Sequence, residues 1–309
     1  MRDKFIKTLY ELTGANSNIY ALISDNGAIV FDQYINKFPD NLINIGIAEA
    51  NMIGIAAGMA SCGKIPFAYT IVPFLTMRAF EQIRIDVCYQ KMNVKLVGIG
   101  CGFVYSNLGA THHSFEDIAL MRTLPGMTIF SPCDSMEVDY VTREAAKING
   151  PVYIRIATGS TPDIYKEQYD FKYGKGVILR EGTDATIIST GLLIYEVLRA
   201  ADNLQKRGIS VRVINIHTIK PLDPEIILTA ASETKNILVV EDHSIFGGLG
   251  EAVCSIIAKN INVNPAVKCL GMEDTFGNEY GSFDDLKKAY KLDSESVECE
   301  LVKLLKMTK

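Results

Sequence analysis

The sequence predicts an α/β protein with two successive domains, each built on a mainly parallel sheet covered by helices. Short apolar runs rich in β-branched residues alternate with longer amphipathic stretches, a pattern typical of parallel strands connected by helices. The alternation fails around residues 159–176, where polar, aromatic and turn-forming residues take over. We therefore expect a linker at residues 161–176, between a domain at residues 1–160 and a smaller one at residues 177–309.

Both domains are expected to follow this alternation from end to end. In the first domain, the expected strands are Ile19–Ile23, Ile65–Tyr69, Val94–Ile99, Thr128–Ser131 and Val152–Ile156, and the expected helices are Glu49–Cys62, Thr76–Cys88 and Ser135–Ile148. In the second, the expected strands are Ala185–Ser189, Val211–Ile216, Ile237–Val240 and Val267–Gly271, and the expected helices are Leu193–Arg207, Asp223–Glu233, Gly250–Asn260, Ser282–Tyr290 and Ser294–Lys306. The stretch at residues 49–62 is small and apolar nearly all round, so we expect a buried helix there.

The composition limits the partners that the chain can take. Its 309 residues are 48% hydrophobic and 22% charged, with a net charge of -5, which offers no basic face to nucleic acid or to anionic lipid. No uncharged apolar run approaches the ~18 residues that a membrane helix needs. We expect neither a nucleic-acid partner nor a membrane partner.

The cysteines and the first residues indicate the compartment. The seven cysteines are widely spread and never form a close metal-ligand pair, so we expect free thiols and no metal site on this chain. The opening MRDKFIKTLYELTG alternates charged and apolar residues, unlike the apolar core of a secretory signal. These features predict a cytoplasmic protein.

One acid stands in an unusually apolar setting. The string NIGIAEANMIGIAAGM enters the expected buried helix with Glu49, whose neighbours include Ile47, Ala48, Met52 and Ile53. Burial of an unpaired carboxylate is costly, so Glu49 needs a partner or a function. The alternative is a helix N-terminal Glu that the helix dipole stabilises, half in solvent.

Four motifs occur in an order found in a known enzyme family. They are INIGIAEANMIGIAAGMA, FAYTIVPFLTMRAFEQIRIDVCYQ, GATHHSFEDIALMRTLPGMTIFSPCDSMEV and EDHSIFGGLGEAV. Spanning about Asn44 to Val253, they resemble the transketolases, the 1-deoxyxylulose-5-phosphate synthases and, more loosely, the β subunits of 2-oxoacid dehydrogenases. The resemblance implies a parallel-sheet pyrimidine-binding domain of a thiamine-diphosphate enzyme, followed by a smaller α/β transketolase C-terminal domain.

The resemblance gives Glu49 a catalytic role. In this family the glutamate hydrogen-bonds the aminopyrimidine ring of thiamine diphosphate. A carboxylic acid that donates to the ring nitrogen favours the imino tautomer, whose freed nitrogen removes the thiazolium proton and creates the carbanion nucleophile. An apolar shell suits this task, because desolvation favours the protonated form of a carboxylic acid.

The second motif is similar to the segment that packs on the same ring. The form F-x-x-x-R-A-[FY]-[ED]-Q implies that Phe74 stacks on the aminopyrimidine and that Arg78 belongs to the cofactor site. In single-chain transketolases the aromatic lies nearer to the following Arg, so the register around Leu75 and Arg78 is open. Phe80 is expected in the core, and a core position is also the alternative for Phe74.

Two further residues, His112 and Asp25, match family positions near the substrate or the cofactor. His112 matches the histidine that touches the sugar near its reacting carbons, and His113 is a weaker substrate candidate; the alternative for either is a capping or surface residue. Asp25, in ISDNGAI, matches an acid near the thiazolium, and its alternative is a helix cap. His243, in EDHSIFGG, is as well explained by a structural or interface role.

The diphosphate half of the family's site is missing from this sequence. The family holds the diphosphate through Mg²⁺ bound by a GDG motif, and no GDG occurs in the chain. Because a Mg²⁺-diphosphate needs a hard-oxygen site, the resemblance implies an N-terminal partner subunit that carries the motif and binds Mg²⁺. We expect a heterotetramer with two copies of each chain.

The substrate positions also depart from the family. Leu108 stands where transketolases carry an acid that reads a sugar hydroxyl. Gly100 or Cys101 stands where they carry a histidine or arginine, and Thr158 stands where they carry an arginine. Such residues bind terminal phosphates through charge-assisted hydrogen bonds. Only Arg2 remains at a matching distance before Asp25, which makes an ordinary pentose-phosphate substrate set doubtful.

Taken together, the motifs predict a split transketolase-like transferase that moves a two-carbon ketol unit from a ketose donor to an aldose-like acceptor. It would act on small-molecule sugars and only together with its partner subunit. Two alternatives stay open: a β-type subunit of a 2-oxoacid dehydrogenase and a non-catalytic assembly subunit. The apolar setting of Glu49 speaks against the second, because a scaffold gains nothing from burying an acid.

Overall fold

The chain folds into two compact units. The computed structural model describes residues 1–26, 28–159 and 161–308. The first unit comprises Met1–Cys101 and Leu120–Phe171, and the second comprises Gly102–Ala119 and Lys172–Lys309. Residues 102–119, which carry the two adjacent histidines, thus cluster with the C-terminal half of the chain. The domain boundaries at residues 160 and 177 stay a prediction.

The first unit is built on a parallel sheet. Its strands follow the order β5-β6-β4-β3-β1-β2, and every neighbouring pair is parallel. The carboxyl ends of these strands therefore lie along one edge. The strands are β1 (Ile19–Ile23), β2 (Leu42–Asn44), β3 (Ile65–Ile71), β4 (Lys95–Ile99), β5 (Thr128–Phe130) and β6 (Val152–Ile156).

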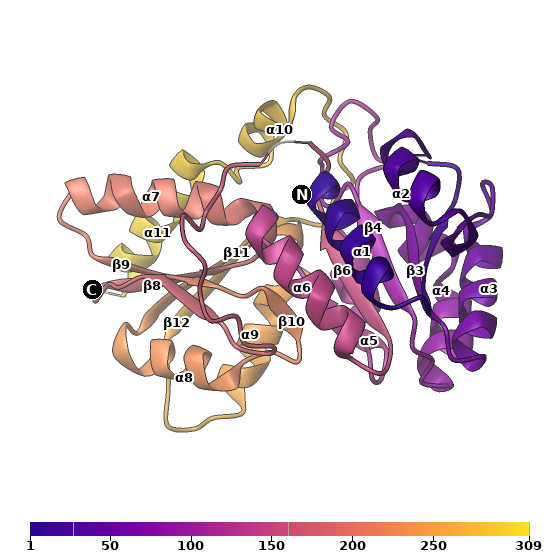
Figure 1. Cartoon of the computed structure of the whole chain (residues 1–309). Helices are drawn as coiled ribbons and strands as arrows, with labels where there is room; N and C mark the ends of the chain where they lie inside the picture. Colours follow the sequence, from indigo (N-terminus) through magenta and orange to yellow (C-terminus); the bar gives the residue numbers. More distant parts are fainter. Residues whose placement is uncertain (27, 160, 309) are drawn as a thin grey trace. The chain divides into compact units, whose positions relative to one another are not determined.

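Two groups of helices pack around this sheet (Figure 1). Helices α1 and α6 pack against each other, and α3 packs against β3 and the helical segment over residues 74–89. The α-helices in this part of the chain are α1 (Arg2–Ala15), α2 (Asp32–Lys37), α3 (Glu49–Ser61), α4 (Phe80–Gln82), α5 (Asp117–Thr123) and α6 (Ser135–Lys147). The sequence pattern did not predict α1, α2 or α5.

Helix α3 is buried along one face only. Met52 and Ile53 are fully buried, whereas Asn51, Gly54 and Gly58 are exposed along another side. The expectation of a helix buried all round is therefore wrong for this chain by itself. An apolar helix with an exposed face of small residues leaves room for a neighbouring chain to approach closely.

The helix expected over residues 76–88 is divided. A π-helix covers Phe74–Arg78, α4 follows, and a second π-helix covers Ile83–Tyr89. The fully buried apolar residues of this segment repeat every four positions: Leu75, Ala79, Ile83 and Val87. An α-helix has 3.6 residues per turn, so residues spaced four apart move gradually around its surface. The wider π-turns in this segment keep the four-residue repeat on one face.

The second unit has a sheet of its own, in the order β12-β11-β8-β9-β7. All neighbours are parallel except β7, which pairs antiparallel with β9. The strands are β7 (Val177–Arg180), β8 (Ala185–Ser189), β9 (Val211–Asn215), β11 (Asn236–Ser244) and β12 (Ala266–Met272), and the short strand β10 (Thr218–Lys220) lies between β9 and β11 in the chain.

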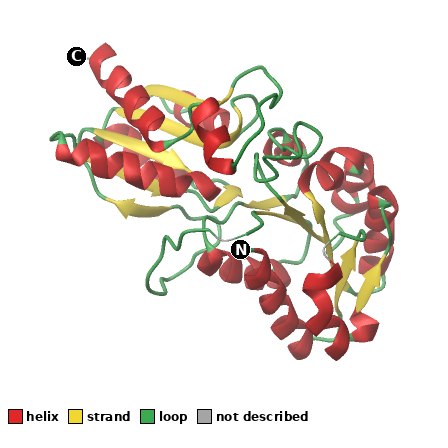
Figure 2. Cartoon of the chain, turned by 90° about the horizontal axis from the view of Figure 1, so that it is seen from above, coloured by secondary structure: helices red, strands yellow, loops and turns green. Residues whose placement is uncertain are grey.

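Helices cover the second sheet on both faces. Helices α7 and α11 pack together on one face, and α8 and α9 pack together on the other (Figures 1 and 2). Phe103 and Phe115 are buried in the core of this unit beside Phe283 and Tyr290, which explains why residues 102–119 belong to it. The helices are α7 (Ile194–Lys206), α8 (Pro224–Glu233), α9 (Leu249–Ala258), α10 (Phe283–Ala289) and α11 (Ser294–Met307). Among the described residues, no helix has both the length and the apolarity to cross a membrane.

Candidate active site

The candidate site lies at the carboxyl edge of the first sheet, where β1, β2 and β3 end. The register pairs Ile23 with both Asn44 and Tyr69, so the residues that follow β1 come close to the ends of its two neighbours. Polar side chains gather there, which is where open parallel sheets usually place their sites.

Glu49 begins α3 at this edge and is buried. Its side chain is only 2% exposed, and its Oε2 accepts a hydrogen bond of 2.8 Å from Nη1 of Arg78. Its Oε1 lies 3.5 Å from the hydroxyl of Ser24, which is 2.6 Å from that of Thr70. The predicted burial is confirmed, and the half-solvated alternative is not what the structure shows. The counter-charge and the helix N-terminus compensate for the cost of burial.

Phe74 and Arg78 approach Glu49 from one π-turn. The guanidinium carbon of Arg78 lies 4.4 Å from the centre of the Phe74 ring, a cation–π contact. Phe74 is half-buried, while Leu75 is fully buried. Of the two neighbours Phe74 and Leu75, only Phe74 keeps part of its surface accessible for stacking. The Arg78 side chain is 51% exposed, so it has room to move.

Asp25 belongs to a second polar group at the same edge. Its amide donates to Oδ1 of Asn44, and Nδ2 of Asn44 donates to Oδ1 of Asp25, both at 3.1 Å. The Oδ1 of Asn44 also accepts from the amide of Gly46 at 3.0 Å. Asp25 has a φ of 58°, a left-handed conformation that Asp tolerates better than most residues. Asn44 thus links the turns after β1 and β2, and it is the donor to the Asp25 carboxylate within the described residues.

Asn26 adds an observation that the sequence did not suggest. Both polar atoms of its side-chain amide are buried without a hydrogen-bond partner within the described part of the chain. Unpaired buried amide groups are costly, and this one follows Asp25 directly. A bound group could supply the missing partner for this amide.

The histidine motif lies in the second unit. His112 is half-buried, its Nδ1 is 2.9 Å from the hydroxyl of Thr111, and burial lowers its pKa. His113 is almost fully buried, and a side chain at Gly277 would clash with its ring. Burial lowers the pKa of His113 too, against nearby backbone carbonyls, which favours a packed, neutral imidazole. Leu108, in the same loop, is 46% exposed.

The remaining candidates have separate surroundings. Arg2 lies on α1, where its Nε donates to Asp3 at 3.1 Å, and it lines a hollow of about 820 Å³ with residues that include Val30 and Asp32. His243 is fully buried. Its Nδ1 donates to the carbonyl of Ser244 at 2.7 Å, and its Nε2 accepts from the amide of Ala119 at 3.2 Å. This geometry defines a neutral tautomer with both nitrogens used, which is a structural role.

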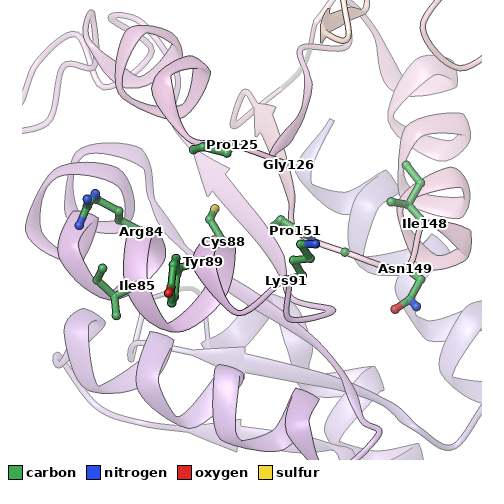
Figure 3. Close-up of a pocket in the computed structure, with 11 residues that line it drawn as sticks. Arg84, Ile85, Cys88, Tyr89, Lys91, Pro125, Gly126, Ile148, Asn149 and Pro151 are labelled. Carbon is green, nitrogen blue, oxygen red and sulfur yellow. The ribbon is translucent and has the colours of Figure 1, made fainter.

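A separate apolar pocket of about 590 Å³ lies at the opposite, amino edge of the first sheet (Figure 3). Cys88 and Tyr89 line it from the second π-helix, and Gly126 and Pro151 line it from the turns that lead into β5 and β6. Because parallel strands start at one edge and end at the other, this pocket is not part of the Glu49 site. Among the residues that the structure describes, no group of three or more His, Cys, Asp or Glu side chains could hold a metal ion.

Comparison with known protein families agrees with the motifs. The model of the transketolase pyrimidine-binding domain matches residues 7–163, and that of the transketolase C-terminal domain matches residues 174–297. The chain belongs to the transketolase family. Its two α/β units are those expected for the C-terminal section of a transketolase, and several of its relatives are named as transketolase subunits.

Two relatives and one solved structure are similar over almost their full length. The chain is 37% identical over 298 residues to the 6-deoxy-6-sulfo-D-fructose transketolase subunit SqwH of Clostridium sp., covering 96% of this chain and 92% of that protein. It is 37% identical over 299 residues to an apulose-4-phosphate transketolase subunit of Phocaeicola vulgatus, covering 96% and 94%. The solved structure, described as a split gene transketolase in an inactive beta4 tetramer, has 36% identity and a TM-score of 0.92 and covers 100% and 99% of the two chains.

The structure of this transketolase subunit brings Glu49, Phe74 and Arg78 together and sets Asp25 at the same edge. Sequence reasoning did not single out Ser24, Asn26, Asn44 and Thr70. One signal was available for Ser24 and Thr70, since each is a polar residue that directly follows an expected strand, but it does not show that they approach Glu49.

Proposed function

We propose that this chain is the pyrimidine-binding subunit of a thiamine-diphosphate-dependent split transketolase, with Glu49 as the acid that activates the cofactor. The observation that carries this proposal is a carboxylate that is 2% exposed at the carboxyl edge of a parallel sheet, held by Arg78 and Ser24. A buried acid with this support, next to an accessible aromatic ring, fits a ligand that is both flat and polar.

Each residue of the site has a separate task. Bound thiamine diphosphate would supply the carbanion chemistry at its thiazolium carbon. Glu49 would form the hydrogen bond to the aminopyrimidine through which a proton passes between the two groups, and the pair Ser24 and Thr70 would fix the orientation of its carboxyl group. Phe74 would offer its accessible ring face for stacking. Asp25 would stand near the thiazolium, and His112, with His113, Arg2 and Leu108 as further candidates, would meet the sugar.

The other half of the site would come from a second polypeptide. We place the GDG motif, Mg²⁺ and the diphosphate on an N-terminal subunit, in a cytoplasmic heterotetramer with two copies of each chain. The exposed side of α3, at Asn51, Gly54 and Gly58, is suited to close contact with a neighbouring chain. The solved relative described as inactive is a tetramer of β chains alone, which supports the need for the partner.

The reaction would be transfer of a two-carbon ketol unit in carbohydrate metabolism. Membership of the transketolase family favours this reaction over that of a 2-oxoacid dehydrogenase. The sulfofructose and apulose-phosphate transketolase subunits named above act on unusual sugars, and this chain carries Leu108 where an acid would read a hydroxyl. We therefore propose an acceptor or donor other than the ordinary pentose phosphates.

Replacement of one oxygen tests the role of Glu49. Glu49→Gln keeps the shape of the side chain but removes the acid, so exchange of the thiazolium proton in the assembled enzyme should fall by at least about 10². NMR exchange in deuterated buffer measures this rate. Glu81→Gln makes the same change of side chain at an exposed position on α4 and is the control. The thiazolium proton should exchange as fast in this variant as in the wild type. Wild-type exchange in a folded, assembled Glu49→Gln enzyme would rule out the proposal.

A further inference from the structure

Two cysteines in the second unit lie against each other. Cys254, on α9, and Cys269, on β12, place their sulfur atoms 4.0 Å apart without a covalent bond. Both side chains are partly exposed, so a small reagent can reach them. Nothing in the proposed transketolase chemistry uses either thiol.

The contact makes the two thiols unequal. Either sulfur can donate to the other at this distance. With the Cys269 thiol as the donor, the hydrogen bond lowers the pKa of Cys254 to about 7 despite partial burial. The same contact and burial, with smaller contributions from the Glu241 and Glu251 carboxylates, raise the pKa of Cys269. Because the thiolate is the reactive form of cysteine, Cys254 is the nucleophile and Cys269 remains a thiol beside it.

The surroundings allow the sulfur atoms to come together. A disulfide needs its sulfur atoms about 2.05 Å apart, so the pair must close by about half of its present distance. Gly250 lies one helical turn before Cys254, and a Cβ there would be 2.6 Å from the Cys269 sulfur, so glycine leaves the space that the thiol occupies. β12 is also an edge strand, held by β11 on one side only.

We propose that Cys254 and Cys269 are a redox-sensitive pair that hydrogen peroxide converts into a reversible disulfide. The Cys254 thiolate attacks a peroxide oxygen, the O–O bond breaks, and the hydroxide that leaves takes up a proton to give water and a Cys254 sulfenic acid. The Cys269 sulfur then attacks the Cys254 sulfur. The S–O bond breaks, and the leaving hydroxide combines with the Cys269 proton to give the second water. Two thiols are oxidised by two electrons and one peroxide is reduced; a dithiol reductant reverses the change.

Mass spectrometry of the full chain tests this pair directly. The wild-type chain is treated with limiting peroxide at pH 7, and free thiols are then alkylated. We expect a mass lower by two hydrogens, two fewer alkylated thiols, and a peptide that links Cys254 to Cys269, all reversed by dithiothreitol. Between pH 6 and pH 8 the rate should rise about tenfold, following the thiolate fraction. First oxidation at the exposed Cys62 or Cys299 would overturn the proposal, as would formation of another disulfide.

Serine variants separate the two roles. Cys269→Ser should stop at a Cys254 sulfenic acid that dimedone traps, and Cys254→Ser should lose the rapid reaction. Cys299→Ser, at an exposed position outside the pair, is the control and should form the disulfide like the wild type. The wild-type mapping needs no variant, so the test holds even if a substitution impairs folding. Equal rates of peroxide reaction in Cys254→Ser and the wild type would contradict the assignment of Cys254 as the nucleophile.

Discussion

The ion pair of Glu49 and Arg78 is the residue-scale feature with the clearest energetic consequence. Arg78→Met should leave the buried carboxylate without its 2.8 Å donor and lower the free energy of unfolding by about 1–3 kcal/mol. Because Glu49→Gln removes the buried charge, the double variant should lose less than the sum of the single changes. Urea unfolding of the four proteins gives the coupling energy. Arg84→Met, at an exposed position on the second π-helix, is the control. A coupling energy near zero would show that the pair does not support the buried acid.

Substrate choice is also a property of single residues. Each charged hydrogen bond lost at Gly100, Cys101 or Thr158 is worth about 1.5–3 kcal/mol, so two losses amount to about two to four decades in specificity. We expect the assembled enzyme to use xylulose 5-phosphate and ribose 5-phosphate less efficiently than a differently substituted sugar, by kcat/KM. Highest efficiency on these two phosphates would contradict the substitution argument and point to phosphate binding by Arg2 and the partner chain.

At the scale of single elements, Lys95 at the start of β4 holds the turn before β6 through two hydrogen bonds. Its ammonium donates to the carbonyls of Ile148 and Gly150 at 2.6 and 2.8 Å, and burial lowers its pKa to about 7. Between pH 7 and the unfolded pKa near 10.4, the unfolded chain binds more protons, so the free energy of unfolding should rise with pH. Lys95 can contribute a slope of at most about 1.36 kcal/mol per pH unit to the free energy of unfolding. The two carbonyls favour the charged ammonium and therefore reduce this slope.

Lys95→Met should remove this rise and leave two carbonyls without their donor. Urea unfolding between pH 7 and pH 9 measures both effects. Lys147→Met, which changes an exposed lysine with a weak surface ion pair on α6, is the control and should keep the wild-type slope. Identical pH slopes in the wild type and in Lys95→Met would mean that Lys95 stays protonated throughout this range.

The elements also show what sequence patterns can and cannot predict. The pattern predicts the buried strands closely, because runs of β-branched residues mark them directly. It predicts one α-helix over residues 76–88, although the four-residue spacing of Leu75, Ala79, Ile83 and Val87 is visible in the sequence. The motifs predict Glu49 as a buried acid with Arg78 in its site. They do not predict Asn44 and Thr70, because the approach of these residues to Asp25 or Glu49 depends on the pairing of strands far apart in the sequence.

At the scale of the whole molecule, the division into two units explains why the histidine loop at residues 102–119 forms a group of its own. His112 and Leu108 lie in residues 102–119, which the buried rings of Phe103 and Phe115 anchor in the core of the second unit. Glu49, Phe74 and Asp25 lie in the first unit. The histidine loop thus folds apart from the residues that hold Glu49, whereas the other substrate positions, Arg2, Gly100, Cys101 and Thr158, belong to the first unit. We therefore expect changes in the histidine loop to alter the substrate without altering the support of Glu49.

The cofactor site is proposed to be divided between this chain and its partner. This chain offers the aminopyrimidine side of the proposed site, while the Mg²⁺-diphosphate contacts are assigned to an N-terminal subunit of about 250–300 residues, in the usual range for such a domain pair. Loss of two charged contacts weakens binding by about two to four decades. Calorimetry should therefore detect weak or no binding of thiamine diphosphate with Mg²⁺ to either chain alone and tight binding to the mixture. Circular dichroism of each chain before titration shows that it is folded. Tight, Mg²⁺-dependent binding by this chain alone would contradict the split site. We expect mixtures that contain wild-type or Glu49→Gln chain both to bind the cofactor. Loss of proton exchange only in the Glu49→Gln mixture would separate assembly from catalysis.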